Sequence, residues 1–328
     1  MRWAVTGATG LLGNNLVRAL VARGDEVRVL ARGRTESEAR GRKELAGLDV
    51  SVVPGDLDDA EALRRCFAGA DIVVHAAASV WIGWTGRDEA MRVNVDGTRA
   101  VCAAVPAGAR LVHVSTVDAL GLGTWAAPAT EDSAPRDGEG GVPYVDSKRA
   151  ADRVVRGSGT DHVFVFPTYM LGPWDWRPSS GRMVLAVARG MARLAPAGGN
   201  NFVHVRDVVE GTIAAARGPS GRGWILGNEN LRYVDAWRRI ARVVDAPAPL
   251  GELPGWAGRA AAVALDAGAA LGLREGEING ASTRMGFLPH WFDPSRARAE
   301  LGMPQTSLED AVSDAWAWFR ARGYVGRA

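Results

Sequence analysis

The segment Thr6-Gly7-Ala8-Thr9-Gly10-Leu11-Leu12-Gly13 joins an apolar run, Arg2 to Thr6, to a stretch with apolar residues at helical spacing. Its three glycines have different physical uses: Gly7 permits a tight turn, Gly10 lets the backbone approach a pyrophosphate, and Gly13 lets a helix pack closely on its strand. A helix that begins here presents unpaired N–H groups and a positive dipole end to that anion. The turn therefore predicts a dinucleotide-binding sheet of the Rossmann type, with these cofactor contacts: Gly7, Thr9, Gly10, Leu11, Leu12 and Gly13.

Apolar runs bounded by Gly, Asp and Pro alternate with amphipathic stretches through the first half of the chain, which is typical of an α/β protein with a doubly wound parallel sheet. The runs predict strands at residues 2–6, 26–31, 50–54, 72–76, 111–115 and 162–166. The stretches between them predict helices at 11–23, 60–67, 88–105 and 144–157. Six such strands with right-handed crossovers would form the Rossmann sheet.

The chain changes character after residue 166, where Pro, Gly, Trp and Arg crowd into 167–182 and again into 246–294. These stretches predict loops and a partly helical cap, and helical spacing predicts helices at 183–192, 207–217, 233–244 and 307–322. The Ala-rich stretch 256–271 is predicted as a buried or lid helix. We expect a cofactor-binding Rossmann domain at 1–166 and a mainly substrate-binding lobe at 167–328, with 202–217 returning to the first domain.

The overall composition gives no reason to expect nucleic acid or a membrane as a partner. The 328 residues carry 39 basic and 37 acidic side chains, and 47% of the residues are hydrophobic. No apolar run reaches the ~20 residues of a spanning helix, and no export signal is expected because the first strand pattern starts at Arg2. Cys66 and Cys102 indicate neither a disulfide framework nor a metal site. We therefore expect a cytoplasmic monomer or homodimer, without a metal, that acts on a small molecule.

The end of the second predicted strand decides which dinucleotide is bound, because a carboxylate there holds a ribose 2′-hydroxyl and a basic group holds a 2′-phosphate. The chain has Arg32 and Arg34 in this place and lacks the carboxylate, which favours NADP(H). NAD(H) stays open, because these arginines could instead be solvated surface residues. Asp56 and Leu57, just past the third strand, are predicted to contact the adenine, although a Gly-Asp-Leu turn needs no ligand to exist.

Tyr144 and Lys148 are four residues apart in a predicted helix, so both side chains fall on one face. An ammonium near a phenol favours the phenolate and lowers its pKa from about 10, which suits an acid-base catalyst. Lys148 is one of only two lysines among the 39 basic residues, which suggests a task that a guanidinium does not perform. We predict that these two residues form the acid-base pair, with Lys148 also holding the cofactor ribose.

Thr116 ends the fifth predicted strand, at the edge of the sheet where an open α/β fold places its ligand. Its hydroxyl is predicted to hold the substrate oxygen beside Tyr144, and Ser115 is the competing candidate. Either hydroxyl could instead only satisfy the backbone at the end of the strand.

The ordered set of motifs resembles the extended short-chain dehydrogenase/reductase superfamily over nearly the whole chain. Besides the glycine turn, the matching fragments are His75-Ala76-Ala77-Ala78, Asn94-Val95-Asp96-Gly97-Thr98, Val114-Ser115-Thr116, Tyr144 with Lys148, Pro167-Thr168 with Leu171-Gly172-Pro173, and Phe202-Val203-His204-Val205 with Asp207. The resemblance implies that Thr116, Tyr144 and Lys148 are catalytic. It further implies cofactor contacts from Ala76, Ala77, Ala78, Asn94, Lys148, Pro167 and Thr168. His75 and Asn94 could also be purely structural.

Within that superfamily, the chain looks like the dihydroflavonol-reductase and aldehyde-reductase branch and like the hopanoid-associated sugar epimerase group. Nucleotide-sugar epimerases usually carry a diphosphate-binding arginine just before the segment that matches Phe202 to Val205, where this chain has Asn200 and Asn201. This departure favours a less charged ketone or aldehyde as substrate.

Aromatic and apolar residues follow the fourth and sixth strands, and we expect the two loops to bring them together around an apolar or aromatic substrate. The predicted substrate contacts are Val80, Trp81, Thr116, Tyr169, Met170 and Trp174, with Ile82, Trp84 and Trp176 nearby. The tryptophans could instead join the cap to the sheet. Two other functions remain open: a nucleotide-sugar epimerase or dehydratase that retains its cofactor, and a nucleotide-sensing regulator without catalysis.

Overall fold

Seven parallel strands form the central sheet of the computed structural model, which describes residues 1–33, 35–135 and 141–325. Their order across the sheet is β10-β6-β5-β4-β1-β2-β3. The strands are Arg2–Thr6 (β1), Glu26–Ala31 (β2), Ser51–Pro54 (β3), Ile72–His75 (β4), Arg110–Val114 (β5), His162–Pro167 (β6) and Gly223–Leu226 (β10). The strand order reverses between β1 and β4, and ligands of open α/β sheets bind at such a point.

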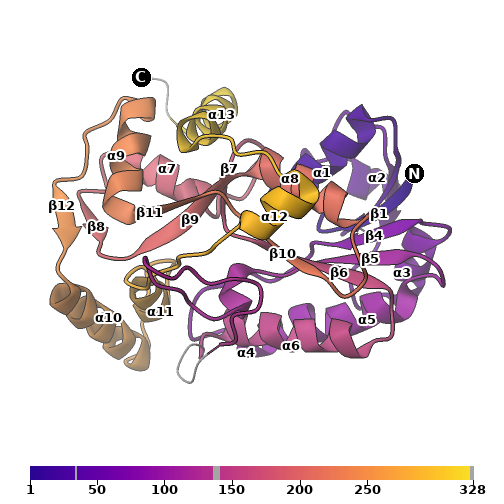
Figure 1. Ribbon diagram of the computed structural model, residues 1–328, viewed down its shortest axis with the longest axis horizontal. Coiled ribbons are helices and arrows are strands. Elements are labelled where there is room, and N and C mark those ends of the chain that lie inside the picture. The colour runs from indigo at the N-terminus through magenta and orange to yellow at the C-terminus, as the bar shows by residue number, and fades with distance from the viewer. Residues whose placement is uncertain (34, 136–140, 326–328) are drawn as a thin grey trace.

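Helices cover both faces of this sheet (Figure 1). On one face Val5 and Val29 pack with helices α1 (Leu11–Ala22) and α8 (Val205–Ala215). On the other face Ala4 and Phe164 pack with α3 (Ala60–Phe67), α5 (Gly97–Ala104) and α6 (Pro143–Gly157). A short helix, α2 (Glu36–Arg40), precedes β3. Burial of both faces explains why the strands read as continuous apolar runs.

The helix predicted at residues 88–105 is divided into three parts. It consists of α4 (Arg87–Ala90), a π-helical segment, η1 (Met91–Asp96), and α5. Short π-helical segments occur frequently at functional sites. Here the segment holds the buried Asn94, whose carboxamide bonds the backbone N and O of Ser79 and the hydroxyl of Ser147.

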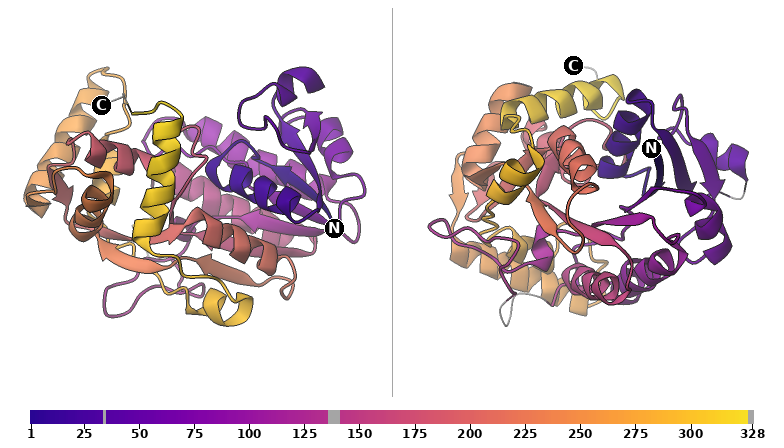
Figure 2. Two further views of the ribbon diagram at one scale, coloured as in Figure 1. Left: turned by 90° about the horizontal axis from the view of Figure 1, so that it is seen from above. Right: turned by 45° about the vertical axis from the view of Figure 1, so that its right-hand side comes forward.

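The C-terminal half builds a second lobe around small sheets. Its strands are Tyr169–Leu171 (β7), Gly199–His204 (β9) and Glu229–Arg232 (β11) in one sheet, and Leu194–Pro196 (β8) with Gly251–Leu253 (β12) in another. Its helices are Gly181–Ala188 (α7), Tyr233–Val244 (α9), Gly255–Ala270 (α10), Gly280–Met285 (α11) and Leu308–Ala321 (α13). Figure 2 (left) shows the long yellow helix, α13, between the orange helices of this lobe and the N-terminal half.

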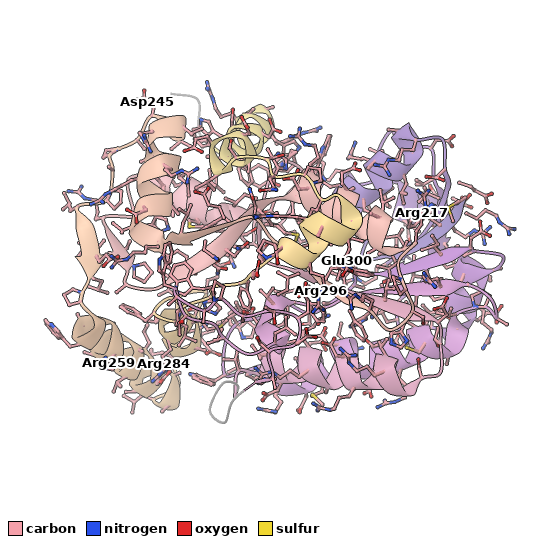
Figure 3. All side chains as sticks on the ribbon, in the orientation of Figure 1. Arg217, Asp245, Arg259, Arg284, Arg296 and Glu300 are labelled. Carbon is pink, nitrogen blue, oxygen red and sulfur yellow. The ribbon has the colours of Figure 1, made fainter. Side chains whose placement is uncertain are left out.

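The C-terminal half also completes the first lobe, because β10 is the seventh strand of the central sheet and α8 packs against α1. Helix α12 (Ser295–Leu301) holds β10 in place. Glu300, labelled on α12 in Figure 3, accepts a hydrogen bond from the indole of Trp224 at 2.8 Å. The sequence did not predict β10, since its four residues carry no periodic signal of their own.

The Ala-rich stretch forms a helix, α10, that is mostly exposed. Only Gly258 and Ala262 are buried, while Trp256 is 70% and Val263 61% exposed. Of the two alternatives, the buried helix is therefore wrong and the lid helix stays a prediction; α10 lies on the surface next to α11 (Figure 1). Within the described residues, no helix combines the length and the apolar character needed to cross a membrane.

Candidate active site

The glycine turn is shaped by two close backbone approaches. Gly7 has φ of 75°, and a Cβ on it would lie 2.5 Å from the carbonyl carbon of Ala76. A Cβ on Gly13 would lie 2.2 Å from the carbonyl oxygen of Gly7. Gly10 is the N-cap of α1, and no described side chain caps this helix end. The open N–H groups of Leu11 and its neighbours therefore fit an anionic pyrophosphate.

A cavity of about 570 Å³ lies at the ends of β2 and β3, where the adenosine end of a dinucleotide would sit. Arg32 and Asp56 line it together with Gly33, Glu38, Gly55, Asp58 and Asp59. No described carboxylate forms an ion pair with Arg32, so its guanidinium is available to a phosphate. Arg34 lies outside the described residues. Leu57 is buried, and a Cβ on Gly97 would lie 2.7 Å from its side chain, so Leu57 belongs to the core beneath the cavity.

Five further predicted cofactor residues lie at the carboxyl ends of β4 and β6, namely Ala76, Ala77, Ala78, Pro167 and Thr168. The N–H of Ala77 donates to the Thr6 hydroxyl at 3.4 Å, which holds the alanine segment against the glycine turn, and Ala76 and Ala78 are its half-buried neighbours. Thr168, next to the buried Pro167, donates its N–H to the carbonyl of Leu226 in β10 at 3.2 Å. His75 is buried, and its two ring nitrogens hydrogen-bond to the hydroxyls of Thr6 and Thr98. Burial lowers its pKa well below 6.5, so His75 is neutral and supports the structure.

Tyr144 and Lys148 lie in the first two turns of α6, which begins at Pro143, a favoured first residue of a helix. Both side chains are buried, at 8% and 3% exposure. The Lys148 ammonium donates to the carbonyl of Val114 at 2.8 Å. Burial lowers the pKa of Lys148 to about 8, although the Asp152 carboxylate opposes this.

The expectation that Lys148 lowers the pKa of Tyr144 is not met. Burial raises the pKa of the Tyr144 phenol, and the negative charge of Asp118 raises it further. A hydrogen-bonding interaction with Thr116 lowers it by less, and Lys148 is not among the causes. The phenol is therefore protonated at neutral pH, because a low-dielectric environment disfavours the phenolate.

The hydroxyls of Thr116 and Ser115 bond to different partners. The Ser115 hydroxyl donates to the Asp152 carboxylate at 2.8 Å, inside the protein, whereas the Thr116 hydroxyl interacts with Tyr144. Thr116 also donates to Asp118 at 3.3 Å. The geometry thus leaves Thr116 as the hydroxyl that could share a substrate oxygen with Tyr144.

Apolar residues from both lobes surround Tyr144. Val142, Val145 and Ala281 are buried with it, and Ile82 and Met285 pack against this group. The loop that carries Ile82 is held by the second lobe, because Asn279 donates to the carbonyl of Ile82 at 2.7 Å. Glu275 accepts hydrogen bonds from the backbone N–H groups of Trp84 and Thr85, both at 2.9 Å. Arg284, labelled on α11 in Figure 3, lies over the ring of Trp84.

The two aromatic loops do not meet, contrary to expectation. Trp81 and Trp84 contact the α10–α11 region, where Trp81 lies close to Glu275. Val80, in the same loop, is 59% exposed. Trp174 instead stacks 3.3 Å below the guanidinium of Arg18 and packs with Trp176 and Trp318, which joins α13 to α1. Tyr169 donates its hydroxyl to the carbonyl of Ser180 and packs on Phe202, and its neighbour Met170 packs against the core of the first lobe.

Sequence reasoning missed three polar residues near the pair: Asp118, Asp152 and His290. Asp118 could have been found from its place two residues after Thr116, and Asp152 from its place one helical turn after Lys148. His290 carries no such signal, since it lies in a predicted loop far along the chain. Two asparagines, Asn200 and Asn201, stand where epimerases usually have an arginine. Asn201 is buried, and its amide is bonded to Asn230 and to the carbonyl of Phe292.

Comparison with known proteins agrees with this arrangement. Residues 3–227 match the NAD dependent epimerase/dehydratase family. The chain is 35% identical to the sterol demethylase protein B of Methylococcus capsulatus, over 99% of this chain and 100% of that protein. It is 30% identical to the ceramide reductase of Caulobacter vibrioides, over 98% of this chain and 95% of that one. A solved nucleoside-diphosphate-sugar epimerase from Pseudomonas aeruginosa superposes with a TM-score of 0.79 at 28% identity, covering 99% of each chain.

Proposed function

The chain belongs to the NAD-dependent epimerase/dehydratase family, and we propose that within it the protein is an NADP(H)-dependent reductase of a ketone or aldehyde on a largely apolar molecule. The family and its relatives establish that the protein is an NAD(P)-dependent oxidoreductase of the extended short-chain dehydrogenase/reductase type. Such an enzyme acts on CH–OH or C=O groups. The proposal concerns the cofactor preference, the substrate class and the residues that carry the reaction.

The observation that carries the proposal is the buried, protonated phenol of Tyr144 beside the hydroxyl of Thr116. A phenol whose pKa is raised keeps its proton at neutral pH, so it starts in the protonation state that a proton donor requires. Thr116 and Tyr144 would bond the carbonyl oxygen, and Tyr144 would give its proton to the alkoxide that develops there. The ammonium of Lys148, one helical turn away, would then offset the charge left on the phenolate.

The cofactor would be held by the residues already described. The glycine turn fits the pyrophosphate, Arg32 would hold the 2′-phosphate of NADP(H), and Lys148 would hold the nicotinamide ribose. When bound, the nicotinamide supplies the hydride to the carbonyl carbon or accepts it in the reverse direction.

Three observations support an apolar substrate. Apolar side chains cluster with Tyr144, namely Ile82, Val142, Ala281 and Met285. Asn200 stands where an arginine would bind a sugar diphosphate, and its amide is bonded to the Tyr233 hydroxyl. Two relatives of similar length are named for a sterol and for ceramide, which are both lipids with long or polycyclic apolar parts.

The test measures consumption of NADPH and of NADH, by their absorbance, with medium-chain ketones and aldehydes and with UDP-sugars. We expect stoichiometric oxidation of NADPH with an apolar carbonyl compound. Tyr144→Phe should lose at least about 100-fold in kcat with cofactor binding retained. Tyr324→Phe, whose hydroxyl bonds the carbonyl of Trp176 away from the site, is the matched control.

The resemblance to the solved epimerase favours one other function, which is epimerisation or dehydration of a nucleotide sugar with the cofactor retained. Turnover of a UDP-sugar without net consumption of NADPH would establish that function and reject the reductase. Full activity of Tyr144→Phe toward any substrate would reject the assigned role of this phenol.

A further inference from the structure

Asp118 and His290 meet beside the catalytic hydroxyls, and the mechanism above uses neither. Asp118 lies in the short 3-10 helix η2 (Val117–Ala119) directly after β5, where its Oδ2 accepts the hydrogen bond from Thr116 Oγ1 at 3.3 Å. His290 comes from the second lobe, between α11 and α12, and its Nε2 lies 3.6 Å from Asp118 Oδ1. Each lobe therefore contributes one member of the pair.

The His290 ring is buried without being fully bonded. Its side chain is 4% exposed, and its Nδ1 has no hydrogen-bond partner among the described residues. Leaving a buried polar atom unpaired costs about 1–3 kcal/mol, so structural histidines are normally bonded at both nitrogens, as His75 is. The backbone of His290 is fixed, since its N–H donates to the carbonyl of Gly199 at 3.3 Å. The backbone is thus fixed, while within the described part of the chain Nδ1 has no partner and Nε2 lies just beyond hydrogen-bond distance of Asp118.

Asp118 is partly exposed and lies close enough to two tyrosines to act on their phenols. Its charge raises the pKa of Tyr144, in the first lobe, and also that of Tyr233, in the second. Its side chain is 20% exposed, so it is reachable, and its 3.6 Å separation from His290 is longer than a hydrogen bond. One carboxylate oxygen is therefore only loosely engaged.

We propose that Asp118 and His290 form a polar subsite for a hydroxyl group on the carbon next to the substrate carbonyl, so that the enzyme prefers α-hydroxyketones to simple ketones. The inference rests on the proposed function. A carbonyl oxygen that accepts the Thr116 proton in place of Asp118 would free Asp118 Oδ2 and set a neighbouring hydroxyl within reach of it, because Thr116 Oγ1 and Asp118 Oδ2 are themselves 3.3 Å apart. The hydroxyl would donate to Asp118 Oδ2, and the imidazole of His290 would hold the carboxylate through Oδ1.

The test compares 1-hydroxydecan-2-one with decan-2-one in NADPH oxidation. A hydrogen bond to a charged group contributes about 1.5–3 kcal/mol, which corresponds to about 10- to 150-fold in kcat/KM. The wild type should therefore prefer the hydroxyketone by at least about tenfold. Asp118→Asn should remove most of this preference, because kcat/KM for the hydroxyketone should fall at least about tenfold more than kcat/KM for decan-2-one. His290→Phe should act in the same direction.

The matched control is Asp314→Asn, because Asp314, on α13, forms another pair of this kind, with His204 at 3.1 Å. This variant should preserve the preference, and thermal melting of all variants reports whether they fold. Equal losses for both ketones in Asp118→Asn would overturn the subsite and leave Asp118 as a support for Thr116. Equal reduction of both ketones by the wild type would also overturn it while the reductase assignment stands. Reduction of neither ketone would reject the proposed function itself.

Discussion

Replacing Lys148 by methionine should make the protein inactive and more stable. Burial lowers the pKa of Lys148 from 10.5 to about 8, which means that the charged form costs the native state about 3 kcal/mol at neutral pH. Methionine fills similar space without a charge but loses the ammonium's hydrogen bond to the carbonyl of Val114, and a bond from a charged group contributes at least about 1.5 kcal/mol. The net gain in the free energy of unfolding at pH 7 is then at most about 1.5 kcal/mol, or a few degrees in Tm.

The sign of the pH dependence makes this prediction specific. The native pKa of Lys148 lies below its unfolded value, so the unfolded chain binds the proton more tightly between pH 8 and 10.5. The penalty is complete below about pH 8 and fades as pH rises, because the native lysine becomes neutral at no further cost. The stability of Lys148→Met relative to the wild type should therefore fall by about 2 kcal/mol between pH 7 and pH 9.5.

Urea unfolding at pH 7 and at pH 9.5 measures both quantities. Lys43→Met is the matched control, since Lys43 is the only other lysine and is exposed, with its ammonium 5.1 Å from the Trp176 ring centre. The control should change little at either pH. A Lys148→Met variant that is less stable than the wild type at pH 7, or whose difference in stability does not depend on pH, would refute the argument that burial makes this ammonium costly.

Two predictions concern the cofactor. Arg32→Asp should shift the ratio of NADPH to NADH activity by at least about tenfold toward NADH, because it replaces the partner of a phosphate by an acceptor for a ribose hydroxyl; an unchanged ratio would reject the role given to Arg32. Gly13→Ala should abolish NADPH binding in a fluorescence titration, because its Cβ would lie 2.2 Å from the Gly7 carbonyl oxygen. Gly157→Ala, where a Cβ meets nothing within 4 Å, should bind normally, and normal binding by Gly13→Ala as well would show that the turn tolerates a side chain.

Local patterns predicted the part of the fold that depends on local physics. Six of the seven central strands and helix α6 were predicted correctly to within one residue at their ends, because continuous apolar runs and helical spacing mark them directly. The four residues of β10 are too short to show a period, and only pairing with β6 makes them a strand. The π-helical segment was equally invisible, since a single inserted residue barely changes the spacing of apolar side chains.

The candidate site shows the same division. The spacing of Tyr144 and Lys148 placed both on one helical face, but their burial depends on residues from distant segments, such as Ala281. For this reason the direction of the Tyr144 pKa could not be predicted from a neighbouring ammonium alone. Composition likewise could not distinguish tryptophans that face a substrate from those that join α13 to α1, because both kinds follow strands of the sheet.

The seventh strand has a practical consequence for protein engineering. A gene truncated after residue 166 would encode a product whose β6 edge is bare, and bare edges recruit strands from other molecules. Such a product would also lack α8 and α12, so apolar surface around Val163 and Val165 would face water. Chimaeras that exchange substrate specificity between relatives must therefore keep residues 205–226 and 295–303 with the nucleotide-binding half. Only the other segments of the C-terminal half can be exchanged.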